Sequence, residues 1–405
     1  MRNLHYVLVV ILSGLLHKVS AQCNGRYASE LFPNVTKTTV QYSHFTVRPN
    51  DGDTLKMDIY QPVGDTFPKR PVVIMAHGGT FIAGDRNEGT SVAVCTMLAK
   101  RGYVTASIDY RLANSQFELM DSLNALQIAL RAVSDMKAAV RFFRKDAATD
   151  NLYRIDPEQI FVGGNSAGAV TALHVAYVND TTELPDYIKT IIAQNGGIEG
   201  NSGNPGYPSH VSGVINLAGG INKLQWIEPN DVPLLSCHGD ADQTVPYGCG
   251  NVLYSFLDLI DLCGSGAIKT WCDQVGTDNI LLTFLGDGHV PWESNTAKRN
   301  QMLDQVAEFM KTYTQCLTPT YAGQVIPPDF KLNIHPNPSH AVFTIDITGV
   351  SEAQLEMLTT LGQTVLHLPL KGSPVTLPIS HLAPGTYILK ITTSGYSTAR
   401  QLIKL

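Results

Sequence analysis

A serine set between two glycines is the residue of this sequence whose surroundings most clearly suggest chemistry. Ser166 is the centre of the pentapeptide Gly-Asn-Ser-Ala-Gly, residues 164–168. The apolar residues 160–162 before it predict a buried strand, and the small residues 167–177 after it predict a helix. A tight strand–turn–helix of this kind admits only small flanking side chains and exposes the serine hydroxyl above the sheet, as a nucleophile requires. The pentapeptide pattern also arises by chance, so the partners of Ser166 carry as much weight as the pattern.

A serine hydroxyl attacks a carbonyl group only when a base removes its proton, and an acid must orient that base. When the serine stands on such a turn, the acid and the histidine follow it in that order. Asp242 comes after a strand predicted at residues 233–237, and His289 comes after another at residues 279–285. Because parallel strands end at the same edge of a sheet, both side chains are expected beside Ser166. The sequence therefore predicts a Ser-Asp-His catalytic triad.

Two neighbouring residues are alternatives for these roles. Asp240 precedes Asp242 by two residues in the same loop and is the alternative acid. His238 ends the strand before that loop and is the alternative base, although its side chain is expected to pack structurally. We favour Asp242 and His289.

A glycine-rich loop supplies the third part of a serine-hydrolase site. Residues 77–81, His-Gly-Gly-Thr-Phe, follow an apolar predicted strand and precede the serine in the sequence. Glycines let backbone N–H groups approach a developing negative charge without interference from a Cβ atom. We predict an oxyanion hole made by the backbone N–H groups of Gly79, Thr80 and Ala167. His77 is expected to support this loop and not to carry protons.

The cysteines give no sign of a metal site. None of the seven stands in a CxxC pair, so neither a metal nor another cofactor is expected. Cys95 and Cys237 lie in apolar segments and are expected to be buried thiols. One disulfide is expected among Cys249, Cys263 and Cys272, with the pairing left open.

The N-terminus predicts export. The apolar run at residues 6–16 and the small residues 19–21 are typical of a signal peptide spanning residues 1–21. The run is too short to span a bilayer, so no transmembrane segment is expected in the mature chain. The formal net charge of -6 gives no reason to expect nucleic acid as a partner.

Strands alternate with helices through the first three quarters of the 405 residues, which predicts an α/β fold with a mostly parallel sheet and helices on both faces. The predicted strands are residues 54–60, 71–76, 103–109, 160–162, 211–217, 233–237 and 279–285, and the predicted helices are 90–101, 123–143, 167–177 and 295–313. The first of these strands alternates cleanly and is predicted to form an edge of the sheet.

Two segments lie outside this rhythm. Residues 179–210 are rich in Asn, Gly and Pro and too long for a plain connection, so they form either a lid or pocket wall or a passive surface insertion. The alternation of strands and helices ends after the predicted helix at residues 295–313. A linker at residues 317–332 follows, and then short strands that predict a small β-sandwich at residues 333–405. The catalytic domain is then residues 22–316. The aromatic candidates for the pocket that holds the acyl group are Trp226, Trp271 and Trp292, with simple packing as the alternative. Trp292 is the best of them, because it is three residues from His289.

With these motifs in place, residues 27–316 resemble the carboxylesterase branch of the α/β-hydrolase family. The resemblance rests on residues 77–81, on the pentapeptide around Ser166 and on the loops that carry the acid and the histidine. It implies hydrolysis of short- to medium-chain acyl esters, or of acetyl and feruloyl groups on plant polysaccharide. Thr80 departs from the third glycine of many esterases, which argues against bulky tertiary-alcohol esters.

Residues 333–405 look like the C-terminal sorting domain of the Bacteroidetes type IX secretion system. The similar motifs are His-Pro-Asn-Pro at 335–338, Thr-Leu-Gly-Gln at 360–363 and Leu-Ala-Pro-Gly-Thr-Tyr at 382–387. The resemblance implies that the type IX machinery is a partner, that this domain is removed, and that the protein is released or attached at the outer cell surface.

Together these features predict a secreted serine carboxylic-ester hydrolase that acts through an acyl-enzyme. A secreted serine peptidase of the prolyl-oligopeptidase kind is the first alternative, because it shares the fold and the triad order. A non-catalytic surface binding protein is the second.

Overall fold

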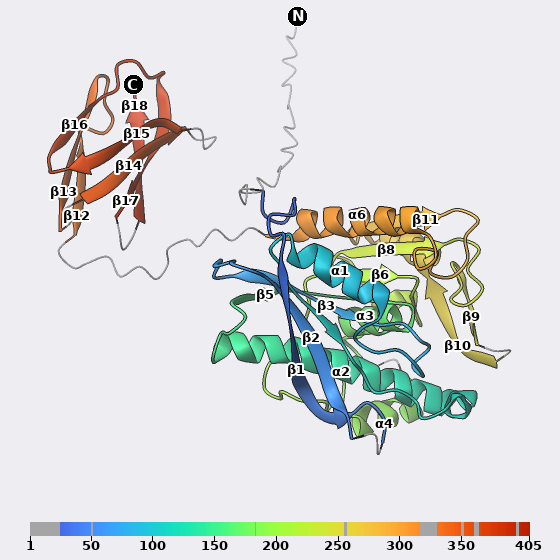
Figure 1. Ribbon diagram of the computed structural model, residues 1–405. Helices are drawn as coiled ribbons and strands as arrows, with labels where there is room; N and C mark the ends of the chain where they lie inside the picture. The colour runs from blue at the N-terminus through green and yellow to red at the C-terminus, as the bar shows by residue number, and fades with distance from the viewer. Residues whose placement is uncertain are drawn as a thin grey trace, which may run out of the picture. The chain divides into compact units, whose positions relative to one another are not determined.

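The computed structural model describes residues 25–49, 52–182, 184–254, 257–315, 330–349, 352–359, 364–393 and 397–405. They divide into two compact units, one within Met1–Thr318 and the other within Pro319–Leu405 (Figure 1). The predicted signal peptide and most of the predicted linker lie outside the described residues. None of the helices in the described part is long and apolar enough to cross a membrane.

An eight-stranded sheet forms the centre of the first unit, in the order β1-β2-β4-β3-β5-β6-β8-β11 (Figure 1). Its strands are β1 (Val35–Thr46), β2 (Thr54–Pro62), β3 (Arg70–Ala76), β4 (Val104–Ile108), β5 (Ile155–Asn165), β6 (Val214–Leu217), β8 (Leu234–Gly239) and β11 (Asn279–Phe284). β2 pairs antiparallel with both β1 and β4, and every pair from β4 to β11 is parallel. The mostly parallel sheet that the sequence predicts is confirmed.

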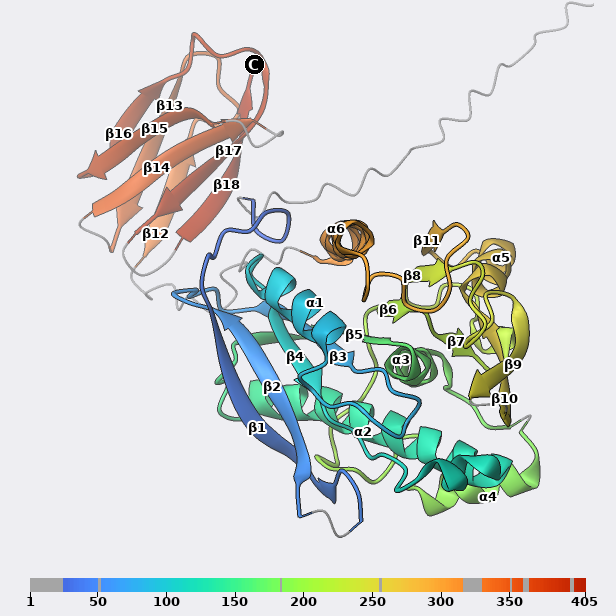
Figure 2. The same ribbon diagram turned by 45° about the vertical axis from the view of Figure 1, so that its right-hand side comes forward.

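Helices cover both faces of this sheet (Figure 2). They are α1 (Gly89–Ala99), α2 (Ser122–Ala148), α3 (Ala167–Tyr177), α4 (Asp186–Gln194), α5 (Ser265–Val275) and α6 (Thr296–Tyr313), with short 3-10 helices η1 (Gln116–Met120) and η2 (Leu224–Trp226). Because side chains alternate along a strand, Val72 and Ile74 of β3 join the apolar cluster under α2 and α3, while Val73 and Met75 join the cluster under α1 and α6. The core is therefore two layers, one on each face.

The prediction of an edge strand at residues 54–60 is wrong, because β1 pairs along β2 and forms the edge instead. Most of β1 is exposed or half-buried and carries threonines and a lysine, as suits a strand whose outer side faces solvent. These polar residues hide the strand from a search for apolar alternation.

A small three-stranded sheet lies beside the main one, in the order β7-β10-β9. Its strands are β7 (Gly220–Ile221), β9 (Cys249–Tyr254) and β10 (Leu257–Gly264). Cys249 and Cys263 face each other in the β9–β10 hairpin and form a disulfide, which resolves the pairing. Cys95 and Cys237 are buried free thiols as expected, and so is Cys272.

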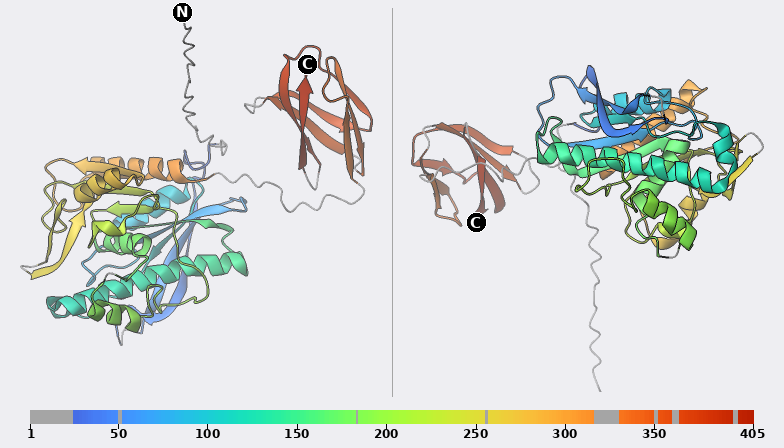
Figure 3. Two further views of the ribbon diagram at one scale, coloured as in Figure 1. Left: turned by 180° about the vertical axis from the view of Figure 1, so that it is seen from behind. Right: turned by 90° about the horizontal axis from the view of Figure 1, so that it is seen from below.

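The second unit is a β-sandwich, as the sequence predicts. One sheet holds β12 (Lys331–His335), β13 (Val342–Thr348) and β16 (Val375–Pro378), and the other holds β14 (Glu352–Thr359), β15 (Thr364–Lys371), β17 (Gly385–Thr392) and β18 (Ser397–Lys404). The two sheets face each other (Figure 3) and enclose an apolar core of their own, which includes Phe343, Leu355 and Leu389.

Candidate active site

Ser166 occupies the sharp turn between β5 and α3. Its φ of 52° and ψ of −116° are sparsely populated for a residue with a side chain. The surrounding packing fixes this turn: a Cβ atom at Gly164 would collide with the backbone of Gly168, and one at Gly168 would collide with the carbonyl of Ala76. The backbone N–H of Ser166 also donates to the carbonyl oxygen of Leu217 on the neighbouring β6, at 2.8 Å.

The structure brings the three predicted triad residues into one hydrogen-bonded chain. His289 Nε2 lies 2.8 Å from Ser166 Oγ, and His289 Nδ1 lies 2.6 Å from Asp242 Oδ2. Asp242 follows β8 and His289 follows β11, two adjacent parallel strands. Asp240 lies elsewhere in the loop and accepts the backbone N–H of Gly286 at 2.6 Å.

The carboxylate of Asp242 is held ionised. Burial by itself would raise its pKa, but hydrogen bonds from His238 and His289 outweigh burial and lower the pKa well below its usual range. The backbone N–H groups of Thr244 and Val245 also donate to its Oδ1, at 2.8 and 3.0 Å. A carboxylate can only accept, so His289 must donate through Nδ1 and turn the lone pair of Nε2 toward Ser166.

His238 is fully buried and contacts the same carboxylate oxygen of the acid as His289. Its Nε2 lies 3.1 Å from Asp242 Oδ2 and 3.1 Å from the carbonyl oxygen of Val245, both of which can only accept. Nε2 therefore carries the proton, and the hydroxyl of Ser265 donates to Nδ1 at 2.7 Å. The sequence predicted structural packing here but not the contact with Asp242, for which the four-residue spacing around the loop is the only signal.

The loop after β3 makes a tight turn next to the serine. Gly79 has a φ of 113°, and its carbonyl oxygen accepts the N–H groups of Ile82 and Ala83, each at 3.0 Å. Among the described residues, the N–H groups of Gly79 and Thr80 meet no hydrogen-bond acceptor. Ala167 opens α3, where a backbone N–H has no acceptor within the helix. Thr80, Ser166 and Ala167 line one small cavity of about 50 Å³.

His77 supports this loop from below. Its ring stacks on Tyr110 with centroids 4.2 Å apart, and its Nδ1 lies 2.6 Å from the carbonyl oxygen of Gly78. The Tyr110 hydroxyl in turn donates to the carbonyl oxygen of His77 at 2.9 Å. Burial lowers the pKa of His77, which keeps the ring neutral. His77 thus has the supporting place that the sequence suggested.

The prediction that Trp292 belongs to the acyl pocket is wrong. Val290 has a φ of 45°, and Trp292 lies in the apolar cluster under α1 and α6, with its ring centroid 5.7 Å from that of Phe284. Trp226 of η2 instead lines a large cavity next to the serine. Residues 179–210 contain α4 and form a wall of this cavity, so the pocket-wall alternative is confirmed over the passive insertion.

In the described part of the chain, no three His, Cys, Asp or Glu side chains are grouped as ligands for a metal ion.

The fold and this site define the first unit as an α/β-hydrolase of the esterase type. More narrowly, residues 57–201 match the model of the BD-FAE family, which is an α/β-hydrolase esterase family. Residues 333–405 match the model described as the secretion system C-terminal sorting domain. This domain assigns the protein to type IX secretion, to the cell surface or the extracellular space.

Individual relatives match more weakly. Lipase 2 of Geotrichum candidum is 28% identical over 145 residues, which cover 34% of this chain and 24% of that protein. Versiconal hemiacetal acetate esterase of Dothistroma septosporum is 28% identical over 152 residues, covering 36% and 40%. The chain thus spans less than half the length of these curated relatives. The butyrate-bound esterase Est2 of Thermogutta terrifontis aligns over 68% of this chain and 93% of its own, at 20% identity and a TM-score of 0.49.

Proposed function

We propose that the protein hydrolyses carboxylic esters through an acyl-enzyme formed on Ser166. The observation that carries this proposal is the unbroken chain of hydrogen bonds from Ser166 through His289 to Asp242. The match of residues 57–201 to an esterase family supports an ester as the substrate. The resemblance noted in the sequence favours short- to medium-chain acyl groups, or acyl groups linked to carbohydrate.

In the first half of the reaction, Ser166 Oγ attacks the ester carbonyl carbon while His289 Nε2 takes its proton. The carbonyl oxygen becomes an oxyanion, which accepts hydrogen bonds from the N–H groups of Gly79, Thr80 and Ala167. When this intermediate collapses, the bond to the alcohol oxygen breaks and His289 gives its proton to that oxygen. The acyl group is left on Ser166 as an ester.

Water reverses these steps in the second half. His289 Nε2 takes a proton from a water molecule, whose oxygen attacks the acyl-enzyme carbonyl at the same oxyanion hole. Collapse releases the carboxylic acid, and the proton returns to Ser166 Oγ. Throughout, the Asp242 carboxylate stabilises the positive charge that appears on the imidazole ring.

The test compares esters with amides on the purified protein. We expect turnover of p-nitrophenyl acetate, butyrate and octanoate that falls at least about a thousandfold in Ser166→Ala. Ser29→Ala, an exposed serine outside the site, serves as the matched control and should keep wild-type rates. Fluorophosphonate labelling should likewise be lost only in Ser166→Ala.

Two results would contradict this proposal. Alanyl- or prolyl-p-nitroanilide cleaved with comparable efficiency would make the protein a secreted peptidase. Absence of both turnover and labelling in the wild-type chain would favour a non-catalytic surface binding protein.

A further inference from the structure

A large apolar cavity adjoins the catalytic serine. It encloses about 420 Å³ between α2, α3 and α4, while the small cavity at Ser166 encloses about 50 Å³. Four residues line both: Phe81, Ala129, Val170 and Ile260. The two cavities are therefore neighbours with an apolar neck between them.

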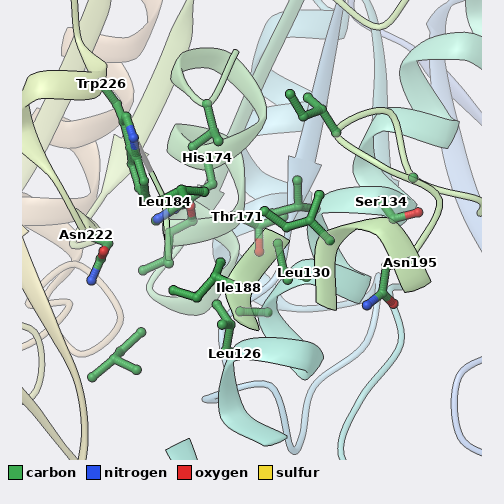
Figure 4. A pocket seen from close by; sticks show the side chains of 18 of the residues that line it. Leu126, Leu130, Ser134, Thr171, His174, Leu184, Ile188, Asn195, Asn222 and Trp226 are labelled. Atoms are coloured by element: carbon green, nitrogen blue, oxygen red, sulfur yellow. The ribbon is translucent and has the colours of Figure 1, made fainter. Parts of the chain in front are cut away.

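One face of α3 leads from the nucleophile along the large cavity. Val170, His174 and Val178 follow Ser166 at intervals of four residues, so they lie on one side of the helix, and all three line the cavity. At about 1.5 Å per residue, His174 lies about 12 Å along the helix from Ser166. Leucines of α2 and Ile188 of α4 close the opposite walls, with Trp226 at one side (Figure 4).

Several polar groups of the walls are bonded to the protein itself. Thr171 Oγ1 donates to the carbonyl oxygen of Ala167 at 2.9 Å, and Lys137 Nζ donates to that of Ile198 at 2.9 Å. Ser134 Oγ accepts the N–H groups of Asn201 and Ser202. His174 Nδ1 lies 2.7 Å from the carbonyl oxygen of Val170, and burial, which disfavours the charged imidazolium, lowers the pKa of His174. A ligand thus meets a mainly hydrocarbon surface, which favours a hydrocarbon group.

The lining of the two cavities favours the acyl side of the scissile bond as the part of the substrate that the large cavity receives. His289 must give its proton to the leaving alcohol, and among the described residues it lines neither cavity. Thr80 and Ala167, which flank the carbonyl oxygen in the proposed mechanism, do line the small one. Leu123 and Tyr187 line the large cavity and are 45% and 56% exposed, so the cavity opens to solvent.

We propose that the large cavity binds an unbranched apolar acyl chain on the order of ten carbons long, a length that carbon–carbon bonds of about 1.5 Å would spread along α3 toward Trp226. This inference rests on the proposed ester hydrolysis and narrows its substrate to medium-chain acyl esters. We call this space the acyl cavity.

A kinetic series on the full secreted chain tests the inference. Each methylene that the acyl cavity buries improves transition-state binding by up to about fourfold, so kcat/KM for p-nitrophenyl decanoate should exceed that for acetate at least about tenfold. Ala129→Phe would obstruct the neck, and Ile188→Trp would fill the middle of the cavity. Each should lower the decanoate-to-acetate ratio at least about tenfold.

Two matched controls introduce the same side chains, Phe and Trp, outside the cavity. Ala148→Phe is exposed at the end of α2, and Thr190→Trp is exposed on α4; both should keep the wild-type ratio. The inference is overturned if acetate is preferred by the wild-type chain, or if the cavity variants and their controls keep the same ratio. A preference for decyl acetate over p-nitrophenyl decanoate would show that the cavity binds the alcohol part of the ester, which would also overturn the inference.

A binding measurement separates this inference from the proposed activity. Decanoate titrated into Ser166→Ala should change the tryptophan fluorescence saturably, and the change should vanish when Trp226→Phe is added. Saturable binding of decanoate without ester turnover in the wild-type chain would contradict the proposed function and still support the acyl cavity. Acetate turnover without decanoate binding would sink the acyl cavity alone.

Discussion

At the scale of single residues, the carboxylate of Asp242 organises the site. Two histidine nitrogens meet its Oδ2, and two backbone N–H groups meet its Oδ1. Four donors fix its orientation and keep it ionised, although it is buried. His289 consequently has one orientation and one tautomer in which it can act on Ser166.

His238 offers a test of this arrangement, because it touches the acid and not the substrate. Replacing it with Phe removes the Nε2–H donor, so the carboxylate loses part of its restraint and we expect kcat to fall about tenfold, equivalent to about 1.4 kcal/mol, with little change in KM. His238→Gln keeps an N–H donor and should recover most of this loss. Steady-state kinetics on p-nitrophenyl butyrate measure both parameters. A Phe variant with the wild-type kcat, or a KM effect alone, would remove His238 from the catalytic arrangement.

Activity should also depend on pH through the base. His289 must be neutral to take a proton, so kcat/KM should fall with a slope of one over the acidic range in which this base becomes protonated. Asp242 has a lowered pKa in the folded protein, so it stays ionised through this range and does not contribute to the fall. A profile that stays flat to about pH 5 would contradict an imidazole base.

Acid unfolding is a separate event from this loss of activity. The pH dependence of stability that Asp242 contributes is opposite in sign to that of a group with a raised pKa. A carboxyl group with a lowered folded pKa stabilises the protein above its unfolded pKa of about 3.9, and this contribution is lost only as the pH falls further. The fall in activity that comes from protonation of the base should therefore be reversible and precede any change in circular dichroism.

At the scale of elements, a row of cations on α2 holds the cavity wall in place. Lys137, Arg141 and Arg144 are buried, and each donates to backbone carbonyl oxygens of residues 198–208. These carbonyl groups lie in an irregular segment without a strand or helix to satisfy them. Side chains of α2 therefore supply the hydrogen-bond donors that a strand or helix would otherwise supply to these carbonyl groups.

Arg141 makes this role measurable. It donates to the carbonyl oxygens of Gly203 and Glu199, at 2.9 and 2.7 Å. Arg141→Met leaves both oxygens without that donor, so the free energy of unfolding should fall by about 2 kcal/mol. Lys145→Met, an exposed cation of the same helix, should change it by less than about 0.5 kcal/mol. Urea denaturation followed by circular dichroism compares the two, and equal effects would show that Arg141 does not hold the insertion.

The role of these three cations could not be predicted from the sequence. Repeated basic residues on an amphipathic helix normally indicate a face exposed to solvent. Here the partners of these residues are carbonyl groups that are distant in sequence, and no local pattern reveals them. The helix α4 escaped prediction for a related reason: Gly, Asn and Pro dominate residues 179–210 and obscure the apolar residues Ile188, Ile191 and Ile192. The acyl cavity needs α2, α3 and α4 together, so it depends on tertiary packing alone.

Features that depend on local geometry and chain order were predictable. The span of α3 agrees with the prediction residue for residue, because a turn at Ser166 and small residues after it leave few alternatives. The positions of Asp242 and His289 follow from the rule that parallel strands end at one edge of the sheet. The prediction for Trp292 was wrong, because closeness to His289 in sequence does not determine on which face of the sheet a side chain packs.

At the scale of the whole molecule, the two units have separate cores and separate tasks. Among the residues that the structure describes, the clusters around the central sheet contain none of the sandwich, and the sandwich core contains none of the first unit. Each unit thus satisfies the physical requirement for folding alone. The site residues all belong to the first unit, and the match to the sorting domain belongs to the second.

This separation predicts that activity and export can be divided within the predicted linker. A chain ending at residue 325 should hydrolyse p-nitrophenyl esters with kcat/KM within about twofold of the full chain, because the site and both layers of its core remain. It should nevertheless stay inside the outer membrane, because the sorting domain is absent. Full-length Ser166→Ala is the reciprocal control, exported but inactive, and immunoblots of medium and periplasm together with ester assays distinguish the two. If the shortened chain reaches the medium, residues 333–405 are not the export signal. If it stays in the cell but loses activity, the sandwich contributes to the site, and the division of tasks between the two units is wrong.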